Sequence, residues 1–134
     1  MRTLLIISSI FFSISAFSNV LNSFDTDGCT IVPDGTFSNP TKWNKCCLRH
    51  DVAYWKGGTR SERKVADKLF RSCLEDFGTH SIAFLYYYGV RVGGSPYSRQ
   101  WFSWGYGWED YRGYRSLSES EQAQVELLMP EINF

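Results

Sequence analysis

The sequence lacks an excess of charge of either sign, because 14 lysine and arginine residues balance 14 aspartate and glutamate residues in a chain of 134. Proteins that hold nucleic acid through its phosphates carry a basic excess, so this balance gives no support to a nucleic-acid partner. No run of lysines or arginines is long enough to indicate electrostatic attachment to anionic lipids. The charge pattern therefore argues against partners that are held mainly by net charge.

Long apolar stretches are also missing. The apolar run at residues 4–12 is too short for a membrane-spanning helix, and no later stretch approaches the roughly 20 apolar residues required. The run follows Met1-Arg2 and precedes small residues around Ala16-Phe17-Ser18, which is typical of a secretory signal peptide. We therefore expect residues 1–18 to be cleaved, leaving one secreted or periplasmic domain of residues 19–134.

Cysteine is sparse, with four residues that all follow the expected cleavage site. An even number in a small exported domain predicts two disulfides formed in an oxidising compartment. Zinc binding is the competing use, but the two separated pairs of CxxC type are absent. Of the three possible pairings, a bond between the neighbours Cys46 and Cys47 would be strained.

Helix signals follow a loop at residues 19–41 that is rich in glycine, proline, aspartate and asparagine. Gly57-Gly58 ends a first apolar pattern, and Thr59-Arg60-Ser61-Glu62 is a capping box that begins a second. The second pattern has one apolar stripe and stops at Gly78. We expect helices at residues 42–56, 59–77, 80–92 and 118–128. The fold is accordingly predicted to be a small, mostly α domain linked by disulfides.

The first of these helices gathers reactive side chains on one face. At about 100° per residue, a sector of roughly 140° contains Cys46, Cys47, His50, Asp51 and Tyr54. Because adjacent side chains diverge by about 100°, His50 and Asp51 cannot form a hydrogen-bonded dyad and are expected to have separate roles. His50 suits a general base, and the Asp51 carboxylate suits a hard cation, above all calcium. The simpler interpretation is a pair of surface residues.

Asp67 is a further candidate on the second helix. The short turn between the two helices predicts antiparallel packing, which brings the margin of the second apolar stripe close to His50. Asp67 lies at that margin and can reach inward toward His50. It can equally pair with Arg63 or Arg71 on the solvated face. Helical position alone favours neither arrangement.

Taken together, these residues resemble the secreted phospholipase A2 superfamily. CCxxHDxxY at residues 46–54 and DxxxxxC at residues 67–73 match the two antiparallel helices of that superfamily in order and in placement. The resemblance covers about residues 27–77, and the loop before the first helix is closest in style to the bacterial members. It implies the disulfides Cys29–Cys47 and Cys46–Cys73.

Two departures accompany this resemblance. Where animal members have one cysteine on each helix, this chain has Ala53 and Ala66, so both halves of one bridge are absent together. The loop that would bind calcium also lacks the glycine-rich pattern of the family and retains only Gly28 and Gly35.

The resemblance implies calcium-dependent hydrolysis of the sn-2 ester of glycerophospholipids, at a membrane surface and by a monomeric enzyme. His50 would activate a water molecule, while Asp67, held in turn by Tyr54, would orient the imidazole. The calcium ligands would be one carboxylate and three backbone carbonyls, from Asp51, Cys29, Ile31 and Gly35. The alternative is a catalytically inactive relative that serves as a secreted binding protein or toxin subunit.

Residues 93–114 form an unusual segment in which tryptophan, tyrosine and phenylalanine alternate with glycine. Such a segment either folds over the core or forms an aromatic surface that contacts a lipid interface. We favour core packing, because a small domain with few aliphatic residues needs this bulk in its interior.

Overall fold

The computed structural model describes residues 19–29 and 31–132, so the expected signal peptide at residues 1–18 lies outside the described part. Four α-helices and one 3₁₀ helix occur within the described residues: α1 (Asn44–Lys56), α2 (Arg60–Glu75), α3 (His80–Gly93), η1 (Pro96–Ser98) and α4 (Glu119–Leu128). These residues include no β-strand, only an isolated bridge between Leu21 and Trp108. No helix among them is both long and apolar enough to cross a bilayer. The prediction of a small, mostly α-helical domain is confirmed.

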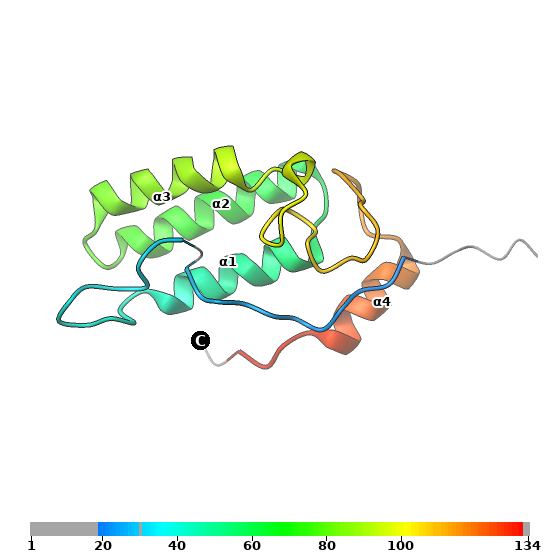
Figure 1. Cartoon of the computed structure of the whole chain (residues 1–134), viewed down its shortest axis with the longest axis horizontal. Coiled ribbons are helices and arrows are strands. Elements are labelled where there is room, and N and C mark those ends of the chain that lie inside the picture. Colours follow the sequence, from blue (N-terminus) through cyan, green and yellow to red (C-terminus); the bar gives the residue numbers. More distant parts are fainter. Residues whose placement is uncertain (1–18, 30, 133–134) are drawn as a thin grey trace, which may run out of the picture.

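The helices α1, α2 and α3 lie alongside one another, and α4 packs at one end beside the N-terminal segment (Figure 1). Between α1 and α2, Gly57 and Gly58 adopt φ angles of 66° and 139°, which favour glycine. The predicted capping box begins α2: the Thr59 hydroxyl accepts a hydrogen bond from the Glu62 N–H at 3.2 Å, and the Glu62 carboxylate accepts one from the Thr59 N–H at 2.6 Å. This tight connection makes α1 and α2 an antiparallel pair.

Helix α1 begins two residues later than predicted, because Trp43 anchors the preceding loop. Its backbone N–H donates to the Asp34 carbonyl at 2.9 Å, and its indole N–H donates to the Pro33 carbonyl at the same distance. The side chain is buried at the base of the helix. Residues 41–43 therefore form a turn that joins the loop to α1.

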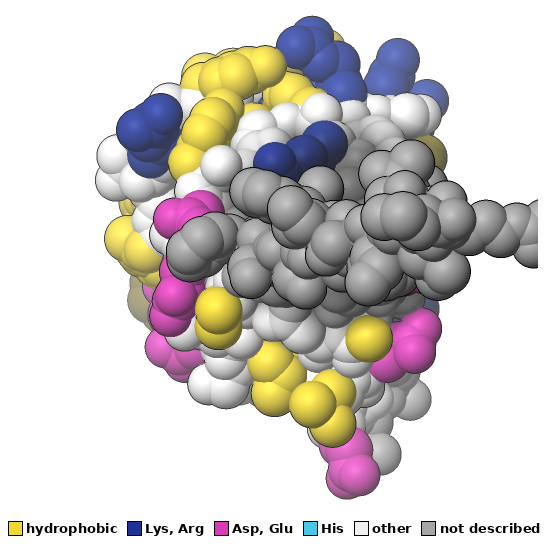
Figure 2. All heavy atoms as spheres, turned by 90° about the vertical axis from the view of Figure 1, so that its right-hand side faces the viewer, with side chains coloured by type: hydrophobic (Ala, Val, Ile, Leu, Met, Phe, Trp, Pro, Cys, Tyr) yellow, Lys and Arg dark blue, Asp and Glu magenta, His cyan; other side chains and the backbone are white. Residues whose placement is uncertain are grey.

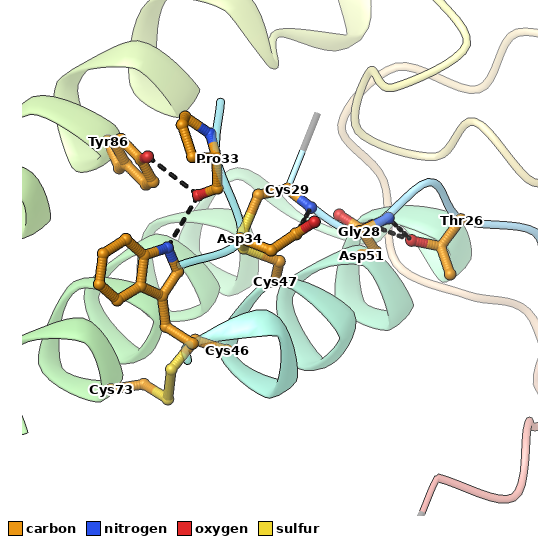
Figure 3. Close-up of a disulfide and its surroundings, with 11 residues drawn as sticks. Thr26, Gly28, Cys29, Pro33, Asp34, Cys46, Cys47, Asp51, Cys73 and Tyr86 are labelled. Carbon is orange, nitrogen blue, oxygen red and sulfur yellow. Dashed lines mark hydrogen bonds between the residues drawn. A yellow bond between two sulfur atoms is a disulfide. The ribbon is translucent and has the colours of Figure 1, made fainter. Parts of the chain in front are cut away.

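The main core lies between these three helices and the loop that precedes them. Its buried members are Cys29, Trp43, Cys46, Cys47, Phe70, Leu74, Ala83 and Tyr86. Disulfides join Cys29 to Cys47 and Cys46 to Cys73, the pairings that the resemblance implies. Figure 3 shows how they fasten the loop to α1 and α1 to α2. Two disulfides fit an extracellular protein.

A second core connects the aromatic segment to α4 and to the N-terminal segment. It consists of Leu21, Trp55, Trp108 and Val125. Trp104 and Trp108 are buried, and their indole N–H groups donate to the carbonyls of Gly58 and Lys56 at 2.8 Å. Tyr97, Trp101 and Tyr111 are exposed instead. In the segment at residues 93–114, two tryptophans are therefore buried, whereas other aromatic side chains are exposed.

A buried ion pair attaches α4 to this second core. The guanidinium of Arg112 donates to the Glu121 carboxylate at 2.8 Å and stacks over the ring of Trp108. The same carboxylate caps α4, because it accepts a hydrogen bond from the Ser118 N–H at 2.8 Å. Burial would raise the pKa of Glu121, but the Ser118 hydrogen bond and the Arg112 charge outweigh it and leave the pKa below its ordinary value.

We expect the substitution Glu121→Ala to lower the free energy of unfolding by about 3 kcal/mol, because it leaves Arg112 buried without a counter-charge. Urea denaturation followed by circular dichroism measures this difference. Glu126→Ala is the matched control, since Glu126 is exposed on the same helix and its loss should cost no more than about 0.5 kcal/mol. Equal stability of the two variants would show that the ion pair contributes little.

Candidate functional site

The best-defined polar arrangement is a buried contact between α1 and α2. His50 Nε2 lies 2.7 Å from Asp67 Oδ1, and the Tyr54 hydroxyl donates to the same oxygen at 2.8 Å. Asp67 is completely buried. The structure therefore brings His50, Asp67 and Tyr54 together, and the alternative of Asp67 on the solvated face is wrong.

Local structure explains why these groups meet. His50 and Tyr54 are four residues apart on α1, so they project in nearly the same direction. Their rings lie 4.2 Å apart, and the ring of Phe70 from α2 stacks on His50 at 4.6 Å. The imidazole thus packs against two aromatic rings, which restrict its orientation toward Asp67.

Two arginines that sequence analysis did not place in the site surround the second carboxylate oxygen of Asp67. Arg91 from α3 donates to Oδ2 at 2.5 Å, and Arg63 from α2 lies 3.9 Å from it. Arg63 is buried and also donates to the Tyr54 hydroxyl at 3.0 Å and to the Val90 carbonyl at 2.7 Å. Arg63 and Asp67 are four residues apart on one helix, and this spacing predicted their contact but placed it on the solvated face. No sequence signal pointed to Arg91, which lies beyond the resemblance.

The surroundings set the charges of these groups. Burial lowers the pKa of His50 below its ordinary value, although the hydrogen bond and charge of Asp67 act in the opposite direction. Burial would raise the pKa of Asp67, but the hydrogen bonds from His50, Arg91 and Tyr54 outweigh it and hold the pKa low. Near neutral pH this gives a neutral imidazole beside an ionised carboxylate, the state needed for a general base.

Asp51 lies on a different side of α1 and meets the loop before it. Its carboxylate accepts a hydrogen bond from the Thr26 hydroxyl, whose oxygen in turn accepts one from the Gly28 N–H at 3.0 Å. Figure 3 shows this contact beside the Cys29–Cys47 disulfide. Burial, together with the charges of Asp27 and Asp34, raises the pKa of Asp51 to about 7 despite the Thr26 hydrogen bond.

The predicted calcium ligands are only partly gathered around Asp51. Cys29 and Ile31 line the same hollow as Asp51, and Ile31 has a φ of 67°, which is rare for a β-branched residue. The Cys29 carbonyl accepts a hydrogen bond from the Val32 N–H at 3.2 Å. Gly35 does not line this hollow; its backbone packs against the turn at Asn39 instead.

One other group near this loop has the composition of a metal site. A carboxylate oxygen of Asp34 and the sulfur atoms of Cys29 and Cys47 lie within 4.8 Å of one another. Because the two sulfurs form a disulfide, they could act as thiolate ligands only after reduction. In the oxidised protein, the Asp34 carboxylate instead accepts a hydrogen bond from the Cys29 N–H at 2.6 Å.

Two hollows reach His50. A hollow of about 440 Å³ lies between α1, α3 and the loop, and its lining includes His50, Asp51 and Tyr54 with mainly apolar neighbours. The other, about 790 Å³, lies between α1 and α2 and is lined in part by Ala53 and Ala66. Of these two, the smaller hollow is the one lined by both His50 and Asp51.

These features form an arrangement in which a buried histidine and a separate carboxylate face one apolar hollow. Chemically, it can accept a proton from a water molecule and can attract a cation a short distance away. Comparison of the chain with known protein families, curated proteins and solved structures found no match.

Proposed function

We propose that this protein hydrolyses the sn-2 ester of glycerophospholipids in a calcium-dependent reaction with a water molecule activated by His50. The observation that carries the proposal is the placement of His50 between Asp67 and the hollow of about 440 Å³ that also contains Asp51. A hollow with apolar walls and few polar groups suits an acyl chain that ends in an ester.

In this mechanism the two nitrogens of His50 have different tasks. Nε2 contacts Asp67, which fixes the tautomer and leaves Nδ1 to accept a proton from water. The water oxygen attacks the ester carbonyl carbon as its proton passes to Nδ1. The protonated imidazole then returns that proton to the departing alcohol oxygen, and the fatty acid is released. Asp67 stabilises the transient positive charge on His50.

The residues around Asp51 fit a hard cation. Asp51 is a half-buried carboxylate close to the charges of Asp27 and Asp34, and these charges add to the effect of burial in raising its pKa. Calcium prefers oxygen ligands, so Asp51 and the carbonyls of Cys29 and Ile31 would hold it. When bound there, calcium would supply polarisation of the ester carbonyl and charge for the oxyanion.

The test is release of sn-2 fatty acid from mixed phospholipid vesicles by the oxidised mature protein, with calcium and with chelator. We expect release with calcium and a loss of nearly all activity with chelator. Equal activity in both conditions would contradict the proposed role of calcium, and no release from vesicles of any headgroup would contradict the proposed reaction.

One observation favours the alternative of an inactive binding protein. Gly35 packs against Asn39 and does not line the hollow of Asp51, so the set of ligands implied by the resemblance is incomplete. Calcium binding without hydrolysis across several headgroups would support this alternative.

We expect Asp67→Asn to reduce turnover by about 10–100-fold, because the residue orients His50 and does not touch the substrate. The neutral amide also faces Arg63 and Arg91 without balancing their charge, so stability should fall as well. Initial rates measured well below the melting temperature separate the two effects. Full activity of a folded Asp67→Asn protein would remove Asp67 from the mechanism.

A further inference from the structure

The larger hollow, of about 790 Å³, forms a groove between α1 and α2 that the proposed reaction does not use. Ala53 from α1 and Ala66 from α2 line this α1–α2 groove, and both are half-buried. Their short side chains leave room between the two helices. Val65 and Leu69 line the α2 side and are 53% and 65% exposed. The α2 side of the groove therefore presents apolar side chains to the solvent.

The α1 side of the α1–α2 groove is basic. Lys45, Arg49 and Lys56 line it, at spacings of four and seven residues that place them on one side of the helix. The one carboxylate of α1, Asp51, lines the smaller hollow instead. An anionic group that approached along this side would therefore meet three cations and no carboxylate from α1.

Carboxylates line the groove only at its two ends. Glu62 lies in the first turn of α2, where it accepts a hydrogen bond from the Thr59 N–H at 2.6 Å. Asp76 directly follows the last residue of α2. The middle of the groove, between these ends, is therefore lined by apolar and basic side chains.

The wider surface of α1 and α2 is basic as well. Residues 42–71 hold nine of the 14 lysine and arginine residues of the chain but three of its 14 aspartate and glutamate residues. Two of these three, Asp51 and Asp67, belong to the candidate site. Lys64 and Lys68 are exposed and form no ion pair within the described residues. Because they are four residues apart, they form a second basic row on the outer side of α2.

Negative charge gathers in another part of the molecule. Residues 109–131, which include α4, hold six acidic and two basic residues. Figure 2 faces the end of the molecule at which α4 lies; acidic side chains occupy the middle and lower parts of this face, and basic side chains lie along its upper edge. The net charge of zero is thus the sum of two oppositely charged regions.

We propose that the α1–α2 groove binds an amphipathic helix of another protein, in which acidic side chains flank the apolar face. The apolar face would cover Val65 and Leu69, and the acidic side chains would lie along the basic rows of α1 and α2. This charge complementarity would fix the orientation of the helix and exclude basic partners. The proposal does not depend on hydrolysis.

The shape and lining of the groove favour a helix over other anionic partners. A bilayer is too flat to enter a groove between two helices. Nucleic acid is held mainly through its phosphates and would leave the apolar α2 side uncovered. An amphipathic helix offers an apolar stripe and charged edges at the spacing of the residues that line the groove.

The experiment titrates the oxidised mature protein into a fluorescent synthetic peptide of about 18 residues, long enough to form a helix. The peptide has leucine at helical spacing on one face and glutamate at the flanking positions. A second peptide has the same leucines with lysine in place of glutamate. We expect the acidic peptide to bind at least about tenfold more tightly, as measured by fluorescence anisotropy.

Two variants test where the acidic peptide binds. Lys45→Glu should weaken binding by about tenfold or more, because it places a like charge against the peptide. Ala66→Leu should weaken it by a similar factor without any change of charge, since the larger side chain fills the groove. Arg99→Glu is the matched control: Arg99 is exposed and lines neither hollow, so the same change in net charge should leave binding unaltered.

Four results would overturn the proposal. The first is no binding of the acidic peptide up to about 1 mM, and the second is equal weakening by Arg99→Glu. The third is unchanged binding by Ala66→Leu, which would place the peptide outside the groove. The fourth is loss of binding to phosphatidylglycerol vesicles in Lys45→Glu while the peptide still binds, which would make this face a membrane contact. Melting curves confirm that each variant is folded.

Discussion

Replacing His50 with glutamine is expected to reduce sn-2 ester hydrolysis by about 10²–10⁴-fold, the usual contribution of a general base. Glutamine can still donate a hydrogen bond to Asp67, as His50 Nε2 does at 2.7 Å, but it offers no nitrogen that accepts a proton from water. Calcium affinity should stay almost unchanged, because His50 is not a ligand in the proposed mechanism. Fatty-acid release and calorimetric titration with calcium measure the two effects.

The matched control for this substitution is His80→Gln. His80 is the other histidine of the chain and lies exposed at the start of α3. Its replacement should leave hydrolysis and calcium binding unchanged. If His50→Gln retained wild-type activity, the water would have to be activated by another group, and the proposed role of His50 would be wrong.

Replacing Asp51 with asparagine is expected to weaken calcium binding and hydrolysis together, since the proposed ligand loses its charge. We expect hydrolysis at limiting calcium to fall by at least about 100-fold. Without calcium, the variant should be no less stable than the wild type, because burial and the charges of Asp27 and Asp34 disfavour an ionised Asp51.

Calcium titration, vesicle hydrolysis and thermal melting in chelator test these three expectations together. Glu109→Gln is a suitable control, because it removes an exposed carboxylate outside the site. A variant at Asp51 that binds calcium as tightly as the wild type would show that the metal, if it binds, is held elsewhere on the chain.

The helices were largely predictable because their ends carry local signals. Both capping boxes lie where the sequence places them, at Thr59 for α2 and at Ser118 for α4. The start of α1 was predicted two residues early, since the indole N–H of Trp43 donates to the Pro33 carbonyl and holds the residue in the turn before the helix. That contact crosses ten residues of loop, and no helix rule can anticipate it.

The candidate site was likewise predictable only in part. The approach of His50 to Asp67 follows from helix spacing and from a short turn, so the sequence could suggest it. Arg91 reaches Asp67 from a third helix, 24 residues further along, and only the packing of α3 brings it there. The position of Gly35 depends on the path of an irregular loop, which composition does not determine.

The adjacent cysteines of α1 have a consequence for resistance to proteolysis. Cys46–Cys73 spans the turn between α1 and α2, with His50 on one side of that turn and Asp67 on the other. A protease that cut the chain once between residues 51 and 66 would separate these two residues in sequence but not in space, because the disulfide would still join the fragments. The bridge to Cys29 likewise retains the loop near Asp51 after a cut between residues 30 and 45. A nicked molecule thus remains one covalent unit that contains every residue of the candidate site.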